Sequence, residues 1–253
     1  MDSNPSNQPD NGTEFSGGDF DDAYPPGYEH HYWHRARSAI VKRYVQAFCC
    51  SRDTLLEIGA GRGHYVRVLR DAGFEAYGCD LGQPFVSGDV RSFYFENTDF
   101  VDLDVNLRDR VQGVLLLDVL EHIEEPQDFL ERILRTFPLL RTLIITVPAR
   151  QELWSNYDEH YRHFLRYDAG KLCDLAKRSG LAVRDYRYFF HGLYVPAWLL
   201  KKLGVDRQTT FSAPRLRWLH RLLGAAFQVE SRILPNRVYG TSLICACNRW
   251  SGS

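Results

Sequence analysis

Short apolar runs alternate along the chain with longer segments in which apolar residues recur every three or four positions. The runs that read as buried strands cover residues 55–58, 114–117 and 143–147, and further strands are expected over residues 74–80, 183–190 and 240–248. Helical spacing follows several of them, as in Phe129, Leu130, Ile133, Leu134 and Phe137. Continuous apolar runs are typical of strands covered on both faces. Their alternation with helical segments predicts an α/β fold with a mostly parallel sheet and helices on both sides.

The first predicted strand runs directly into a turn that is rich in glycine. Residues 56–63 read Leu-Glu-Ile-Gly-Ala-Gly-Arg-Gly, and a helical pattern follows at Tyr65, Leu69 and Ala72. Glycine suits such a turn because it accepts positive φ and leaves room for a ligand beside the backbone. A strand, a glycine turn and a helix start therefore predict a nucleotide-like ligand. The dinucleotide pattern G-x-G-x-x-G is not met, since its third glycine is replaced by His64.

Two further segments agree with a nucleotide-like ligand. The second predicted strand ends on Asp80, at roughly the 20-residue distance from the turn at which an acid binds the ribose in βαβ nucleotide sites. The run at 114–117 is followed by Asp118-Val119-Leu120-Glu121-His122 and a proline. The acid Glu57 before G-x-G-x-G, the acid Asp80 and this Leu-Glu-His together resemble the class I S-adenosylmethionine-dependent methyltransferases.

The resemblance covers roughly residues 28–249 and implies a doubly wound, Rossmann-like, seven-stranded sheet. Its last two strands, 183–190 and 240–248, would form a closing antiparallel hairpin. Residues 153–155 (Leu-Trp-Ser), 158–162 (Asp-Glu-His-Tyr-Arg) and 239–243 (Tyr-Gly-Thr-Ser-Leu) extend the likeness to a bacterial-type subgroup. This subgroup implies S-adenosylmethionine as the cofactor and no single substrate.

The same resemblance implies roles for individual residues. Glu57, Gly59, Ala60, Gly61 and Gly63 would hold the methionine end of the cofactor. Asp80 would bind the ribose, and Leu81, Asp118 and Val119 are expected as further cofactor contacts. For the adenine amino group, Asp102 has the best distance to the fourth strand, with Asp99 and Asp104 as close rivals.

Two histidines at the carboxyl edge of the sheet are candidates for a general base. Histidine suits the role because its ordinary pKa lies near working pH. We expect His160 rather than His122, although each has a plain structural alternative: His122 as a residue at a helix start, and His160 as an orienting partner of Asp158 or Arg162.

Composition limits the remaining possibilities. The chain has 253 residues, 44% of them apolar, which is enough for one core and one domain over residues 28–253. Residues 1–27, without Lys or Arg, predict a disordered acidic tail. Six cysteines without zinc-site spacing favour a reducing, cytoplasmic setting. His30, His31 and His34 lack a metal-binding helix motif, so no metal is expected.

Two segments are expected to cover the site. Tyr32 and Trp33 precede an amphipathic helix and would form part of a lid over the cofactor. Residues 191–237, inserted between the last two strands, carry eight basic and two acidic residues around two amphipathic helices. This insertion predicts an acceptor lid. Its basic face is either merely solvated or contacts an anionic membrane or a lipid-linked substrate; nucleic acid is not expected.

The expected function is methyl transfer from S-adenosylmethionine to an oxygen of an unidentified acceptor, which would be a small molecule or a glycan-like or lipid-linked substrate. The alternative is a cofactor-binding regulatory or partner protein without catalysis. A dehydrogenase is disfavoured by His64.

Overall fold

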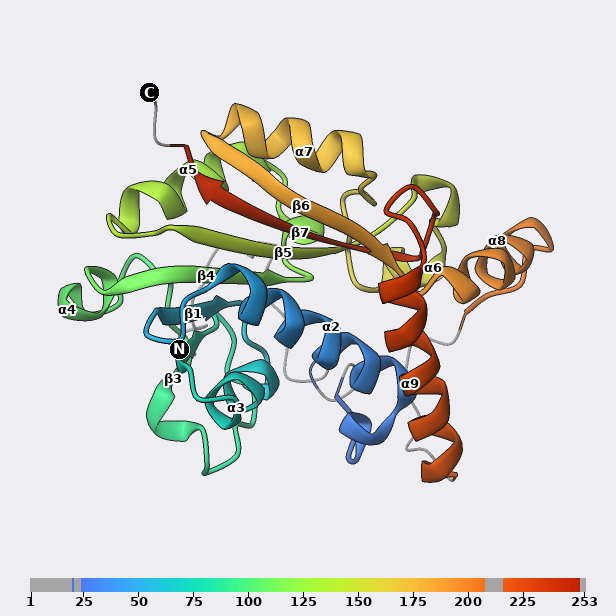
Figure 1. Ribbon diagram of the computed structural model, residues 1–253, viewed down its shortest axis with the longest axis horizontal. Coiled ribbons are helices and arrows are strands. Elements are labelled where there is room, and N and C mark those ends of the chain that lie inside the picture. Colours follow the sequence, from blue (N-terminus) through green and yellow to red (C-terminus); the bar gives the residue numbers. More distant parts are fainter. Residues whose placement is uncertain (1–19, 21–23, 208–215, 251–253) are drawn as a thin grey trace, which may run out of the picture.

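The computed structural model describes residues 20, 24–207 and 216–250, which form a seven-stranded sheet in the order β3-β2-β1-β4-β5-β7-β6 (Figure 1). The strands are β1 (Thr54–Ile58), β2 (Glu75–Cys79), β3 (Tyr94–Phe95), β4 (Val111–Leu117), β5 (Thr142–Pro148), β6 (Leu181–Phe189) and β7 (Ser242–Arg249). β1 to β5 pair in parallel, whereas β7 runs antiparallel to both β5 and β6. The predicted mostly parallel sheet with a closing antiparallel hairpin is confirmed.

Helices cover both faces of this sheet. They are α2 (Tyr32–Phe48), α3 (His64–Asp71), α4 (Val105–Arg108), α5 (Pro126–Thr136), α6 (Asn156–His160), α7 (Ala169–Arg178), α8 (Tyr194–Lys202) and α9 (Arg217–Ile233). Short 3₁₀ turns are η1 (Tyr28–His30), η2 (Arg91–Phe93), η3 (Leu120–His122), η4 (Gln151–Leu153) and η5 (His191–Leu193). Successive β4 residues alternate between two cores: Val114 and Leu116 pack on the side of α5 and α7, and Leu115 and Leu117 on the side of α2 and α3.

The strand order reverses between β1 and β4, the innermost pair of the parallel sheet. Ligands of open α/β sheets bind in the crevice at the carboxyl ends of the strands at such a point. The glycine turn follows β1 and Asp118 follows β4, so both lie at this crevice. β3 has only two residues, which leaves a long irregular segment between β2 and α4.

The insertion between β6 and β7 contains α8 and α9, with α9 lying alongside α2 (Figure 1). Tyr32 of α2 stacks on Phe227 of α9 with ring centroids 5.6 Å apart, and its amide donates to His220 Nδ1 at 3.1 Å. The insertion is therefore anchored on the helix that begins beside the crevice. No helix within the described residues has the length and apolar character needed to cross a membrane.

Parts of the expected tail lie outside the described residues, namely 1–19 and 21–23, as does the link 208–215. Phe20 is buried, and Tyr24 lies over the glycine turn, where its hydroxyl would be 3.0 Å from a Cβ at Gly61. The described residues of this segment thus contribute to the site.

Candidate functional site

A cavity of about 780 Å³ lies at the carboxyl ends of β1, β2, β4 and β5. Its walls come from the start of α2, the segment after β3, residues 157–166, α8 and the first turn of α9. This volume is in the range of pockets that enclose a cofactor or a drug-sized ligand. Segments far apart in the sequence therefore meet around one ligand-sized space.

The glycine turn forms one end of the cavity. Gly59 and Gly61 have φ angles of 71° and 51°, which residues with a Cβ rarely adopt. The amides of Gly59 and Ala60 donate to the carbonyl of Cys79 at 2.9 and 3.1 Å, which ties the turn to β2. Gly59, Ala60 and Gly61 line the cavity. Gly63 does not; it is the N-cap of α3, with a φ of 72°.

Two of the expected acids face this turn. Glu57 is buried and lines the cavity, and its Oε2 makes no hydrogen bond within the described residues. Burial raises the pKa of Glu57 well above its usual value; the charge of Arg37 opposes the rise and that of Asp80 adds to it. Asp80 accepts hydrogen bonds from the amides of Gly61 and Gly82, both at 2.9 Å. Asp80 is thereby held at the cavity wall, which Glu57 and the expected contact Leu81 also line.

The acid after β3 that reaches the cavity is Asp99. Its carboxylate is paired with Arg132 of α5. Asp102 is exposed and does not line the cavity, and Asp104 instead caps α4 through the amide of Asn106 at 2.8 Å. Because β3 ends at Phe95, the segment after it reaches the cavity at Asp99, three residues before the expected Asp102.

Arg37 of α2 organises the exit of β4. Its guanidinium lies 2.8 Å from Asp118 and donates to the Tyr65 hydroxyl and to Thr146 Oγ1, both at 2.7 Å. Burial acts to lower the pKa of Arg37, but the charge of Asp118 together with Tyr65 and Tyr24 raises it above its usual value. Asp118 has a φ of 62° and, with Val119, lines the cavity. This role was not predicted from the sequence. A signal for it was that Arg37 lies four residues before the apolar Val41, and therefore on the buried face of the helix.

The two histidines proposed as bases occupy different places. His122 lines the cavity, and burial together with the neighbouring His163 lowers its pKa to about 3. His160 is the last residue of α6; it is exposed and is not among the cavity-lining residues. After α6 the backbone turns at Arg162, with a φ of 55°, and directs His163 into the cavity instead.

His163 is held by a buried acid that the sequence did not reveal as its partner. Its Nδ1 lies 2.9 Å from Asp158 Oδ1, which also accepts from Arg166 Nε at 2.8 Å. Burial would raise the pKa of Asp158, but the hydrogen bond with His163 and the charge of Arg166 lower it to about 2. Asp158 also closes a capping box with Ser155 at the start of α6. The imidazole of His163 is therefore fixed in orientation.

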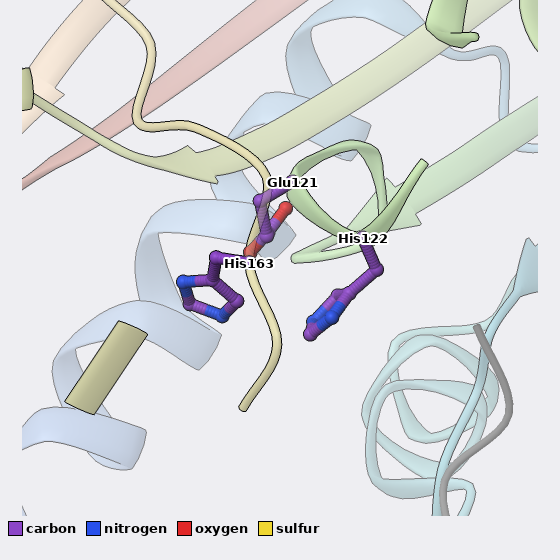
Figure 2. Close-up of side chains that lie close together, drawn as sticks. All are labelled: Glu121, His122 and His163. Carbon is purple, nitrogen blue, oxygen red and sulfur yellow. The ribbon is translucent and has the colours of Figure 1, made fainter. Parts of the chain in front are cut away.

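Glu121 lies beside the two cavity histidines. It is 1% exposed, and its Oε2 makes no hydrogen bond within the described residues. Burial raises its pKa well above the usual value, and the charge of Asp118 adds to the rise. Figure 2 shows Glu121, His122 and His163 converging from two neighbouring segments.

Aromatic and apolar residues line a further part of the cavity. Tyr32 and Trp33 line the cavity, and Trp33 stacks on Phe190 with ring centroids 5.7 Å apart. α8 contributes Pro196, Ala197 and Leu200, and His220 comes from α9. The insertion thus forms a wall of the cavity.

Comparisons with known proteins agree with this arrangement. Residues 30–186 match the family model described as "Methyltransferase domain". A comparison with curated proteins finds no match.

Three solved structures are similar in fold. A chain from the Haloferax volcanii complex of the methyltransferase activator Trm112 has 20% identity, with 90% of this chain and 93% of that chain covered and a TM-score of 0.53. Magnesium protoporphyrin IX methyltransferase from Synechocystis PCC 6803, with bound S-adenosylhomocysteine, has 15% identity, 85% and 83% coverage and a TM-score of 0.51. The Burkholderia thailandensis 1,6-didemethyltoxoflavin-N1-methyltransferase has 15% identity, 88% and 80% coverage and a TM-score of 0.51. Because the family model covers more than half of the chain and the fold agrees, the chain belongs to the class I S-adenosylmethionine-dependent methyltransferases.

Proposed function

We propose that this enzyme methylates an oxygen of a small acceptor, glycan-like or lipid-linked, which shares the cavity with the cofactor. The observation that carries the proposal is the shared lining of one cavity. The glycine turn, Glu57 and Asp80 line the same cavity as His122 and residues of the insertion. A cofactor bound at the glycine turn would present its methyl group within the cavity that His122 and the insertion line.

The cofactor roles follow from the lining residues. Glu57 and residues 59–61 hold the methionine end, and Asp80 binds the ribose hydroxyls. We assign the adenine amino group to Asp99 rather than Asp102, because Asp99 lines the cavity and Asp102 does not. Leu81, Asp118 and Val119 complete the contacts, within a domain that spans residues 28–253.

The reaction is an in-line displacement. The acceptor oxygen forms a bond to the methyl carbon as the carbon–sulfur bond breaks, S-adenosylhomocysteine leaves, and the hydroxyl proton passes to a base. We propose that His122, and not His160, faces the acceptor, because only His122 lines the cavity.

The outer face of the insertion supports an acceptor at an anionic membrane surface. Leu200 of α8 points to the cavity side, whereas Leu203 on the same segment is 74% exposed and Trp218 of α9 is 60% exposed. The basic residues nearby include Lys201, Lys202, Arg217 and Arg221. Exposed apolar side chains with a basic fringe bind interfaces that contain anionic lipid. A cytoplasmic setting is supported by the six cysteines, all of them free thiols.

Two measurements test the proposal. The protein is incubated with methyl-labelled S-adenosylmethionine and with aqueous or lipid fractions of a cell extract. Transfer of label is expected in the lipid fraction. Cofactor binding without label transfer to any fraction would instead support the regulatory protein, and label confined to the aqueous fraction would exclude the lipid-linked acceptor.

Flotation with phosphatidylglycerol vesicles tests the membrane face. Trp218→Ser is expected to reduce binding, while Trp250→Ser is the control, because Trp250 is 64% exposed but follows β7 and lies outside the insertion. Equal binding of the two variants would contradict the role of α9.

A further inference from the structure

We propose that Glu121, His122 and His163 bind a divalent transition-metal ion on the acceptor side of the cavity. Each residue offers one ligand atom, and these three atoms lie within 4.8 Å of one another. Figure 2 shows Glu121 and His122 on the turn after β4 and His163 on the segment after α6. Small side-chain movements would bring the atoms to one ion, since ligand bonds of about 2 Å place neighbouring donors roughly 3 Å apart.

The carboxylate of Glu121 offers a buried oxygen as a metal ligand. It is 1% exposed and belongs to the cavity lining, and its buried Oε2 makes no hydrogen bond within the described residues. A buried polar oxygen without a partner costs free energy that a bound cation would recover. Asp118 and Asp158 also lie near Glu121, and each of them is paired with an arginine, Arg37 and Arg166 respectively.

Each of the two imidazoles is oriented by a hydrogen bond from one of its ring nitrogens. His163 uses Nδ1 for Asp158, so its Nε2 is left for the ion. His122 hydrogen-bonds the backbone of Tyr161, and the two rings meet edge to face with centroids 4.7 Å apart. Metal-binding histidines generally have such a partner on the other ring nitrogen, often a carboxylate, because it fixes the ring and the tautomer.

The donor set indicates the kind of metal. Two imidazole nitrogens and one carboxylate oxygen suit zinc, cobalt, iron or manganese, whereas magnesium and calcium prefer oxygen ligands throughout. Three protein ligands leave coordination positions open, and both histidines line the cavity. The acceptor oxygen would occupy such a position, where the ion favours loss of its proton to water; with the ion bound, His122 would act as a ligand and would no longer accept the proton itself. This catalytic use rests on the proposed function; metal binding itself rests on the three residues.

Metal binding is tested without cofactor or acceptor. The full-length protein is dialysed against EDTA and titrated with cobalt(II), followed by its visible d–d absorption, and with zinc(II) by calorimetry, with magnesium(II) for comparison. One cobalt or zinc ion per chain is expected, with no thiolate charge-transfer band. Absence of this stoichiometric binding in the wild-type protein, or a thiolate band, would overturn the proposal.

Matched variants locate the ion. Glu121→Gln and His163→Asn are expected to weaken binding by more than the roughly 10- to 100-fold typical of changes around a metal site. His160→Asn is the control, because His160 is exposed, outside the cavity and only three residues from His163. Circular dichroism and S-adenosylhomocysteine binding check that each variant is folded. Undiminished affinity in folded Glu121→Gln or His163→Asn would refute the site.

The two proposals fail separately. Metal binding without methyl transfer would contradict the proposed function and leave the metal site intact. Methyl transfer that is unchanged after metal removal would refute the catalytic use of the ion.

Discussion

The replacement Arg37→Met is the most direct perturbation of the link between α2 and the sheet. It removes the ion pair with Asp118 and the hydrogen bonds to Tyr65 and Thr146 while keeping most of the side-chain volume. Loss of one partner of a buried ion pair costs about 3–5 kcal/mol. The Asp118 side chain is 34% exposed and can be rehydrated, whereas that of Arg37 is 6% exposed. We therefore expect a loss at the lower end, about 3 kcal/mol.

Chemical unfolding followed by far-UV circular dichroism measures this loss. For a chain of this size it corresponds to a decrease in Tm of about 6–12 °C. Arg35→Met, two residues earlier on α2, is the control, and we expect it to change stability by less than about 1 kcal/mol. A double-mutant cycle with Asp118→Asn isolates the pair, and we expect the two changes to be non-additive. A loss below about 1 kcal/mol for Arg37→Met, or an additive cycle, would refute the reasoning.

Three other changes test the cavity. Gly61→Val should abolish S-adenosylhomocysteine binding in calorimetry, because a Cβ there meets Tyr24. Gly73 also has a positive φ, of 89°, but open space around a Cβ, so Gly73→Ala should retain binding. Asp99→Ala should weaken cofactor binding and Asp102→Ala should not; the opposite result would restore the original assignment. Burial, with the charges of Arg67 and Arg37, lowers the pKa of His64 from 6.5 to about 4. The unfolded chain therefore binds this proton first, so stability should fall by up to about 3 kcal/mol as pH drops from 7 to 4. In His64→Asn, unfolding curves across this pH range should show a loss of stability that is smaller by up to about 3 kcal/mol.

The local pattern of the chain was enough to predict six of the seven strands, but not β3, which has only two residues. β1, β4 and β5 are short apolar runs, and the glycines after β1 are needed because Gly59 and Gly61 adopt positive φ. The acid Asp80 could be found for the same reason, since the second strand ends directly before it. These features depend on neighbours along the chain, so they can be read without knowing the fold.

The contents of the cavity depend on which segments the fold brings together. With a β3 of only two residues, Asp99 lines the cavity and Asp102 does not, and after the left-handed residue Arg162 it is His163 that lines the cavity, whereas His160 does not. Which residue of a segment lines the cavity changes when the segment shifts by a single residue. The spacing of apolar residues along the chain does not reveal such a shift.

The sequence by itself thus determined most of the strands and helices, the glycine turn after β1 and the resemblance to the family, because these follow from short-range patterns of apolar residues, glycine and acids. Only the tertiary structure decided that Arg37 reaches Asp118, and that Asp158 and His163 meet Glu121 and His122. These groups lie on separate segments that contact one another only because the parallel strands end at one edge of the sheet.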